Sequence, residues 1–418
     1  MALRDTAGSA ANASRAMSRM RSRFACASAR NLTSGSAIIP LDQTERSPLI
    51  NKRRIVHLIT LQGWPMQYVK LGRSGLEVSP VCIGCMGFGD PAVGHPRWSL
   101  DEEASRSLIR HALEAGINFF DTANLYSNGN SEEIVGKALR DFVNRDSVVI
   151  ATKLCAPMHN GPNAFGLSRK TIMTEVDHSL RRLGTDYIDL YQIHRRDQTT
   201  PWEETLEALH DLVKAGKVRY LGASSMMAWE FAKALHLQKT NGWTRFISMQ
   251  DNYNLLAREE EREMLPLCAD EGVQTVVYSP LARGRLARSW GTITRRSETE
   301  PAGAGQNEAT AAADRQIIDA VNAIATERGV NPAEISLAWL RRQPVVAAPI
   351  VGALKPKHID DAIAALSIGL TDDEVKRLET PYTPRGDGQG PSDPAALARI
   401  LETVSGFKKD TPDLIERK

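Results

Sequence analysis

The chain has few cysteines, no long apolar run and almost no excess charge. It holds five cysteines in 418 residues, which is too few for a disulfide scaffold and is typical of a reducing compartment. No apolar stretch approaches the roughly 18–20 residues that cross a bilayer, so we expect no membrane span. The formal net charge of +2 gives no reason to expect nucleic acid as a partner.

A metal site is also missing from the sequence pattern. Cys82 and Cys85 form a C-x-x-C motif, but a structural zinc site needs two more ligands at similar spacing, and none appears. A redox motif of this kind normally opens a helix, whereas this run is typical of a strand that ends at Gly84. We therefore interpret both residues as ordinary strand cysteines and predict no metal.

Residues 1–65 differ in composition from the rest of the chain. Their first 30 residues contain six arginines and one acid, among many serines and alanines, as in a mitochondrial transit peptide. Asp42 and Glu45 break the amphipathic pattern, and no clear cleavage site is present. We interpret this segment as a disordered extension before a cytoplasmic folded domain over residues 66–418, with mitochondrial import as the alternative.

From Val81 onward, short apolar runs alternate with helical patterns, which indicates repeated β/α units. The predicted strands are 81–84, 117–120, 147–152, 188–192, 218–222, 246–250, 274–278 and 345–350. The predicted helices are 100–115, 131–140, 168–183, 202–215, 227–237, 259–271, 314–328 and 356–365. Ser99 and Ser168 are the predicted caps of the first and third helices.

Strict alternation of eight strands with eight helices favours an α/β fold, a closed (β/α)₈ TIM barrel. An open doubly wound sheet is the alternative, but its usual G-x-G-x-x-G motif does not follow the first strand. Residues 68–71 and 76–79 flank Gly-Arg-Ser-Gly and predict a β-hairpin that closes the N-terminal end of the barrel. The polar stretch 282–313 predicts a mobile loop.

Four polar residues follow separate apolar runs: Asp121, Tyr126, Lys153 and His194. The C-terminal ends of barrel strands converge on one site, so we expect these side chains to meet. A phenol is a poor acid at neutral pH, but a nearby ammonium lowers its pKa, and a carboxylate can hold that ammonium in place. With an imidazole to orient a carbonyl oxygen, the set suits carbonyl reduction by a hydride-donating cofactor.

Each of the four residues also has a structural interpretation when taken alone. Asp121 could form a turn or cap a helix, and Tyr126 could simply pack. Lys153 could be solvated, and His194 could be a structural histidine. Asp121 and His194 could instead bind a metal, although no convincing third ligand follows. Only the joint placement favours the catalytic interpretation.

Four segments closely resemble the aldo-keto reductases of the bacterial and fungal type, which are related to the channel β-subunits. They are GINFFDTANLY at 116–126, SEEIVG at 131–136, ATK at 151–153 and YQIH at 191–194. The resemblance extends over residues 66–382, with the motifs in the right order on the right elements. It implies a (β/α)₈ oxidoreductase that uses NADPH or, as the alternative, NADH.

The same resemblance implies roles for individual residues. Tyr126 is the expected proton donor, tuned by Lys153 and Asp121, while His194 orients the carbonyl. Ser224 and Gln250 match contacts to the nicotinamide carboxamide, and Ser225 stands where the family usually has asparagine. The other expected cofactor contacts are Tyr278 stacking on the nicotinamide, Leu281, Ala282 and Gly284 at the pyrophosphate, and Lys355, Lys357, His358 and Asp361 near the adenosine.

The adenosine end departs from the family pattern. Lys355 and Lys357 at a helix start suit the 2′-phosphate of NADP. His358 stands where Arg or Gln is usual, Asp361 where Glu is usual, and Ala362 where Asn is usual. We therefore expect NADPH as the cofactor, with NAD as the alternative.

The expected activity is reversible reduction of a small-molecule aldehyde or ketone to an alcohol. Phe88, Trp98, the loop 155–166, Arg195 and the C-terminal tail are expected to line the substrate pocket, because loops of this kind carry specificity. One alternative is a cofactor-sensing regulatory subunit with little turnover. A metal-dependent barrel hydrolase is the other. The sequence makes no prediction of the substrate or the oligomeric state.

Overall fold

The computed structural model describes residues 59, 66–92, 96–294, 298 and 308–385. All of them belong to one compact unit, residues 55–418. The predicted disordered extension lies almost wholly outside the described residues. Part of the predicted loop over 282–313 and the C-terminal tail from residue 386, which was expected at the substrate pocket, also lie outside them.

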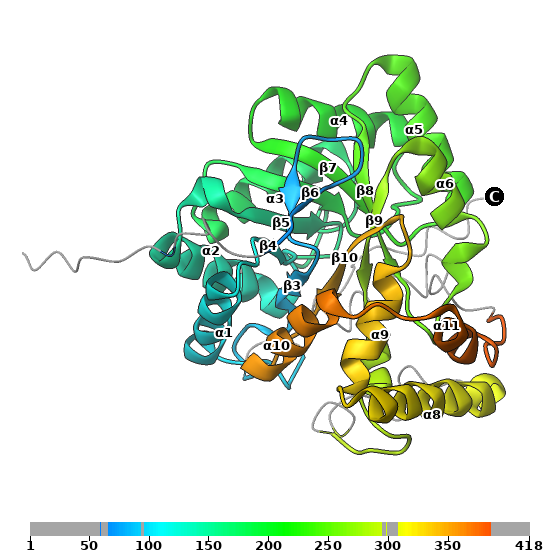
Figure 1. The fold of residues 1–418 in the computed structure, drawn as a ribbon. Coiled ribbons are helices and arrows are strands. Elements are labelled where there is room, and N and C mark those ends of the chain that lie inside the picture. The colour runs from blue at the N-terminus through cyan, green and yellow to red at the C-terminus, as the bar shows by residue number, and fades with distance from the viewer. Residues whose placement is uncertain (1–58, 60–65, 93–95, 295–297, 299–307, 386–418) are drawn as a thin grey trace, which may run out of the picture. The chain divides into compact units, whose positions relative to one another are not determined.

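Eight parallel strands close into a barrel in the order β10-β3-β4-β5-β6-β7-β8-β9, as Figure 1 shows. The strands are β3 (Cys82–Gly84), β4 (Phe119–Asp121), β5 (Val149–Leu154), β6 (Ile188–Ile193), β7 (Val218–Ser224), β8 (Phe246–Asn252), β9 (Gln274–Tyr278) and β10 (Val346–Val351). Closure of the first strand on the last, with Cys82 opposite Ile350, leaves no free sheet edge. The predicted (β/α)₈ barrel is confirmed.

Helices cover the outside of this barrel (Figure 1). They are α1 (Glu102–Glu114), α2 (Asn130–Phe142), α3 (Arg169–Leu183), α4 (Trp202–Lys214), α5 (Ala228–Asn241), α6 (Met264–Glu271), α8 (Ala311–Arg328), α9 (Pro332–Arg341), α10 (Pro356–Ala364) and α11 (Asp372–Glu379). The ends of α3 follow directly from the sequence. The Ser168 side chain accepts from the Thr171 N–H, and Gly184 ends the helix at a φ of 61°.

Three sequence predictions about helices are wrong in detail. Asp101, not Ser99, caps α1 by accepting from the Ala104 N–H. The predicted helix 259–271 is a 3₁₀ turn followed by the shorter α6. The alternation is not strict, because α8 and α9 both lie between β9 and β10.

Helix α9 was not predicted because it lacks the polar face that marks a surface helix. Eight of its ten residues are buried, so its apolar positions show little helical periodicity. A signal was nevertheless present at its start. Asn331 and Glu334 form a capping box around Pro332, which begins the helix.

The predicted hairpin is present and packs into the N-terminal end of the barrel. Strands β1 (Val69–Lys70) and β2 (Glu77–Val78) pair antiparallel. Leu71 and Val78 are fully buried in one cluster with the inward residue Phe119. Gly72 has a φ of 60°, and a Cβ there would lie 2.4 Å from the Ile247 carbonyl oxygen, so only glycine fits.

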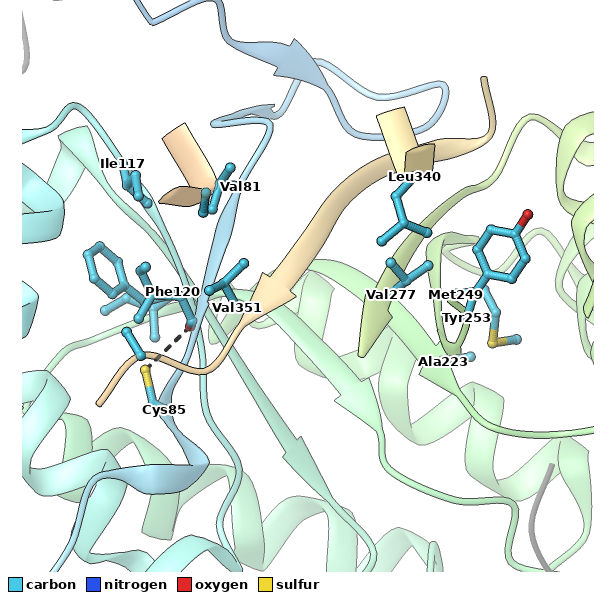
Figure 2. Close-up of a cluster of buried hydrophobic side chains, with 14 of the residues drawn as sticks. Val81, Cys85, Ile117, Phe120, Ala223, Met249, Tyr253, Val277, Leu340 and Val351 are labelled. Atoms are coloured by element: carbon cyan, nitrogen blue, oxygen red, sulfur yellow. Dashed lines mark hydrogen bonds between the residues drawn. The ribbon is translucent and has the colours of Figure 1, made fainter. Parts of the chain in front are cut away.

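Side chains on the strands alternate between the barrel interior and the helices. Figure 2 shows part of the outer layer, where Val81, Phe120 and Val351 gather on one side, and Val277 and Leu340 on the other. At the C-terminal ends of β4 to β8, the inward positions carry polar residues instead of apolar ones. In the strand register, Lys153 of β5 pairs with Gln192 of β6.

Candidate active site

A buried ion pair lies at the C-terminal end of the barrel. Lys153 Nζ donates to Asp121 Oδ2 at 2.5 Å, to the Thr122 carbonyl oxygen at 2.8 Å and to Tyr126 Oη at 3.3 Å. The two charged side chains are only 0% and 3% exposed. All three ammonium donors are therefore used, and one of them holds the phenol. The structure brings three of the four predicted catalytic residues into direct contact.

Two glutamine side chains hold the other oxygen of Asp121. Gln192 Nε2 donates to Asp121 Oδ1 at 2.9 Å, and Gln250 Nε2 donates to the same atom at 3.0 Å. Gln192 was missed at the sequence level, although its inward register beside Lys153 was a usable signal. The carboxylate thus has partners on both oxygens, which a buried charge requires.

The direction of the Tyr126 pKa differs from the sequence prediction. Lys153 lowers the pKa of Tyr126, as predicted, but burial raises it by more and Asp121 also raises it, so the pKa lies above its ordinary value of 10. The phenol is therefore protonated at neutral pH. Since Lys153 donates to Oη, the hydrogen of the hydroxyl remains available to another acceptor.

His194 follows β6 and meets the Tyr126 ring edge-on, with the ring centroids 5.9 Å apart. Burial, then Lys153 and Arg195, hold the pKa of His194 well below 6.5, so the ring is neutral at pH 7. Its Nδ1 atom is buried and has no hydrogen-bond partner. A neutral imidazole carries one N–H and one acceptor nitrogen, and His194 lines the cavity described next.

A cavity of about 1200 Å³ extends from Tyr126 and His194 to Lys355 and His358. Of the predicted site residues, Lys153 lies behind Asp121 and does not line this cavity, and neither does Ala282. The other predicted catalytic and cofactor residues do: Asp121, Tyr126, His194, Ser224, Ser225, Gln250, Tyr278, Leu281, Gly284, Lys355, Lys357, His358 and Asp361. Of the residues expected at the substrate pocket, Trp98, Phe165 of the loop 155–166 and Arg195 line the cavity. Phe88 does not, because it is fully buried among the apolar side chains of the outer layer.

The predicted nicotinamide contacts are linked by hydrogen bonds. Ser224 Oγ donates to the Gln250 carbonyl oxygen at 2.9 Å. Ser225 Oγ donates to Tyr278 Oη at 3.5 Å, and Ser225 takes the left-handed conformation with a φ of 48°. Both serines line the cavity, and the conformation of Ser225 is one that non-glycine residues rarely adopt outside functional sites.

The predicted pyrophosphate contacts form a turn with successive left-handed residues. Ala282, Arg283 and Gly284 have φ values of 47°, 57° and 88°. Backbone turns of this kind gather N–H groups and suit an anion. Arg288 lies against Gly284, where a Cβ would come within 2.7 Å of the guanidinium.

The predicted adenosine contacts are partly engaged with one another. Lys357 Nζ donates to Asp361 Oδ1 at 2.8 Å, and Asn331 Nδ2 donates to the same atom at 2.9 Å. The Leu354 N–H donates to His358 Nδ1 at 3.2 Å. Of the predicted lysines, Lys355 therefore remains without an ion pair in the described part of the chain.

Arg288 is a cavity residue that sequence reasoning missed. It is half-buried, burial lowers its pKa, and no acidic partner faces it among the described residues. The signal was a run of three arginines, 283, 285 and 288, after the seventh barrel strand. Arg288 adds positive charge to the end of the cavity where Lys355 lies.

The described residues contain no cluster of three or more potential metal ligands. Within the same residues, no helix is both long and apolar enough to cross a membrane. Cys82 and Cys85 are buried free thiols. Cys82 lies in β3, as predicted, whereas Cys85 begins the 3₁₀ turn that follows the strand.

Residues 80–382 match the aldo/keto reductase family. Versiconal hemiacetal acetate reductase of Aspergillus parasiticus is 45% identical over 77% of this chain and 98% of that protein. Aldo-keto reductase AFTS1 of Alternaria alternata is 43% identical over 75% and 91%. Putative aryl-alcohol dehydrogenase AAD16 of Saccharomyces cerevisiae is 39% identical over 77% and 98%.

Proposed function

The chain belongs to the aldo/keto reductase family, and from that premise we propose that it catalyses NADPH-dependent reduction of an aldehyde or ketone to an alcohol. Tyr126 is the proton donor in this proposal. We place the activity in the folded part from residue 66 and in the cytoplasm. The observation that carries the proposal is the Lys153 hydrogen bond to Tyr126 Oη, which leaves the phenol proton available at one end of a large cavity.

The residues that line the cavity fit a nicotinamide dinucleotide. Ser224, Gln250 and Tyr278 would hold the nicotinamide, and the left-handed turn 282–284 would hold the pyrophosphate. Two cations near the far end, Arg288 and Lys355, support NADPH over NADH, because a 2′-phosphate adds negative charge there. When bound, the cofactor supplies the hydride.

The side chains of this protein handle the proton and the substrate oxygen. The neutral His194 ring donates a hydrogen bond that orients the carbonyl. Tyr126 then protonates the oxygen as negative charge develops on it. The negative charge left on Tyr126 Oη is stabilised by Lys153, which stays in place through Asp121.

We further propose that the carbonyl is attached to an aromatic ring. The cavity is lined by Trp98, Phe165 and Trp229, whose rings offer stacking surfaces. One of the similar proteins bears the name aryl-alcohol dehydrogenase, which agrees with this substrate class.

Replacing Tyr126 with Phe tests the proposal. We expect Tyr126→Phe to lower kcat/KM for NADPH-dependent aldehyde reduction by about 10²–10⁴-fold, the usual contribution of a proton donor, while NADPH still binds. Absorbance of NADPH measures turnover, and calorimetry measures cofactor binding. The matched control is Tyr191→Phe, which removes a buried hydroxyl without a partner on the outer face of β6 and should leave activity intact.

Two results would overturn the proposal. Equal activity of Tyr126→Phe and Tyr191→Phe would remove Tyr126 from the proton-donating role. Tight NADPH binding by the wild-type protein without turnover of any aldehyde or ketone in a broad panel would instead favour the regulatory alternative.

A further inference from the structure

Arg195 is a cation beside the catalytic residues that has no partner in the described chain. It directly follows His194 at the end of β6, it is partly exposed, and it lines the same cavity as Tyr126 and His194. Its charge contributes to lowering the pKa of His194, which places it within electrostatic reach of that ring. No hydrogen bond or ion pair engages its guanidinium within the described residues.

Arg196, the next residue along the chain, differs from Arg195 because its guanidinium has partners within the protein. The Arg196 guanidinium stacks over the Trp202 ring at 4.2 Å, and its Nη1 donates to the Thr200 carbonyl oxygen at 3.1 Å. Arg196 therefore has a structural role on the cavity wall. Arg195, one position away and equal in charge, has none of these contacts.

The acidic residues that line the cavity are already engaged elsewhere. Asp121 is paired with Lys153. Asp197 accepts hydrogen bonds from nearby backbone and threonine groups, Glu230 accepts from the Met227 N–H, and Asp361 is paired with Lys357. The lining thus offers no free carboxylate to Arg195.

One further acid responds to the charge of Arg195 without pairing with it. Asp251 of β8 is fully buried, and its two carboxylate oxygens have no hydrogen-bond partner. Arg195 lies close enough to act on its pKa, but no ion pair joins them among the described residues. An unpaired guanidinium at the edge of a partly apolar cavity is well placed to bind an anionic oxygen group of a ligand.

We propose that Arg195 binds an anionic oxygen group on the substrate, so that the preferred substrate is an aromatic aldehyde or ketone that also carries a carboxylate or an ionised phenol. Trp98 and Trp229 of the same cavity would stack on the aromatic part. This inference rests on the proposed carbonyl reductase function and names its substrate class.

Matched pairs of substrates test this specificity. One pair is 3-carboxybenzaldehyde and its methyl ester; the other is 4-hydroxybenzaldehyde in mildly alkaline buffer and its methyl ether. The wild-type protein should prefer the charged member of a pair. We expect Arg195→Met to lower the charged-to-neutral ratio of kcat/KM by roughly 10- to 100-fold, the worth of a charge-assisted hydrogen bond. The pair with the larger change identifies carboxylate or phenolate as the anion.

Two further variants separate specific binding from general charge. Arg195→Lys should restore part of the ratio, because lysine keeps the charge but loses the two-pronged geometry. Arg196→Met removes the same charge from the same wall and should leave the ratio as in the wild-type protein. An unchanged ratio in Arg195→Met, or an equal loss in Arg196→Met, would overturn the inference and leave the reductase proposal standing.

A binding experiment does not depend on turnover. Calorimetry with 2-naphthoate and 2-naphthamide, with and without NADP⁺, should show a preference for naphthoate that Arg195→Met loses, while NADP⁺ affinity stays the same. A matching loss of NADP⁺ affinity would assign Arg195 to the cofactor and overturn the inference. Naphthoate binding that depends on Arg195, in a protein that reduces no carbonyl, would support the anion site and overturn the reductase proposal.

Discussion

Replacement of Lys153 with Met should remove both stability and activity, for two separable reasons. Lys153 is fully buried, and its ammonium neutralises Asp121 at 2.5 Å. In the variant, Asp121 keeps only the neutral amide donors of Gln192 and Gln250. Removal of one partner from a buried pair typically costs about 3–5 kcal/mol in free energy of unfolding, because it leaves an uncompensated charge.

The double variant distinguishes the ion pair from ordinary packing. Asp121→Asn combined with Lys153→Met removes both charges and keeps an oxygen that can accept from the two glutamines. We expect it to be more stable than Lys153→Met alone, with a coupling free energy within the usual range of about 0.5–3 kcal/mol. Urea unfolding measures this difference. The matched control is Lys170→Met on the exposed surface of α3, which should change stability by no more than about 0.5 kcal/mol.

Activity should not return with stability in the double variant. Without Lys153, nothing stabilises the negative charge on Tyr126 Oη, so NADPH oxidation should remain lowered by about 10²-fold or more. The reasoning would be refuted if Lys153→Met unfolded at the same urea concentration as Lys170→Met. It would also be refuted if the double variant regained wild-type turnover.

Two further predictions concern buried groups outside the catalytic contact. Burial raises the pKa of Asp251 from 3.8 to about 7, so between these pH values the folded protein holds a proton that the unfolded chain has released. The free energy of unfolding should therefore fall as the pH rises from about 4 through 7, by at most ~4 kcal/mol. Asp251→Asn should abolish that fall. Urea unfolding at several pH values checks this, and parallel curves for both proteins would contradict it. Gly136→Ala should destabilise the protein by about 1–3 kcal/mol, because its Cβ would lie 2.0 Å from the Leu183 carbonyl oxygen where α2 meets α3. Gly75→Ala, with open space around the new Cβ, is the control, and equal melting temperatures of the two variants would show that the contact does not matter.

The sequence was sufficient to predict the barrel because its separate local signals indicated the same elements. Short apolar runs, glycine stops and caps such as Ser168 all pointed to the same β/α units. It failed at α9, where burial on nearly all sides erases the amphipathic pattern. Periodicity reports a boundary between core and water, so an almost fully buried helix gives little of that signal.

The candidate site was predictable as a set of strand ends, but its electrostatic balance was not. Motif positions placed Asp121, Lys153 and Tyr126 together, and the structure joins them through hydrogen bonds. The net direction of the Tyr126 pKa depends on how much water burial excludes, which a sequence does not state. Gln192 was missed for a related reason, because its importance comes from its register beside Lys153 and not from its residue type.

The hairpin at the floor of the barrel has a consequence for the order in which the protein folds. The Gly72 N–H donates to the Gln274 side chain, 202 residues further along the chain, and the Arg73 N–H donates to the Gly272 carbonyl oxygen. At synthesis rates of about 5–20 residues per second, the hairpin leaves the ribosome roughly 10–40 s before these partners exist. Until the later strands are synthesised, Leu71 and Val78 lack part of the apolar cluster that buries them. The hairpin is therefore made early but reaches its final packing late.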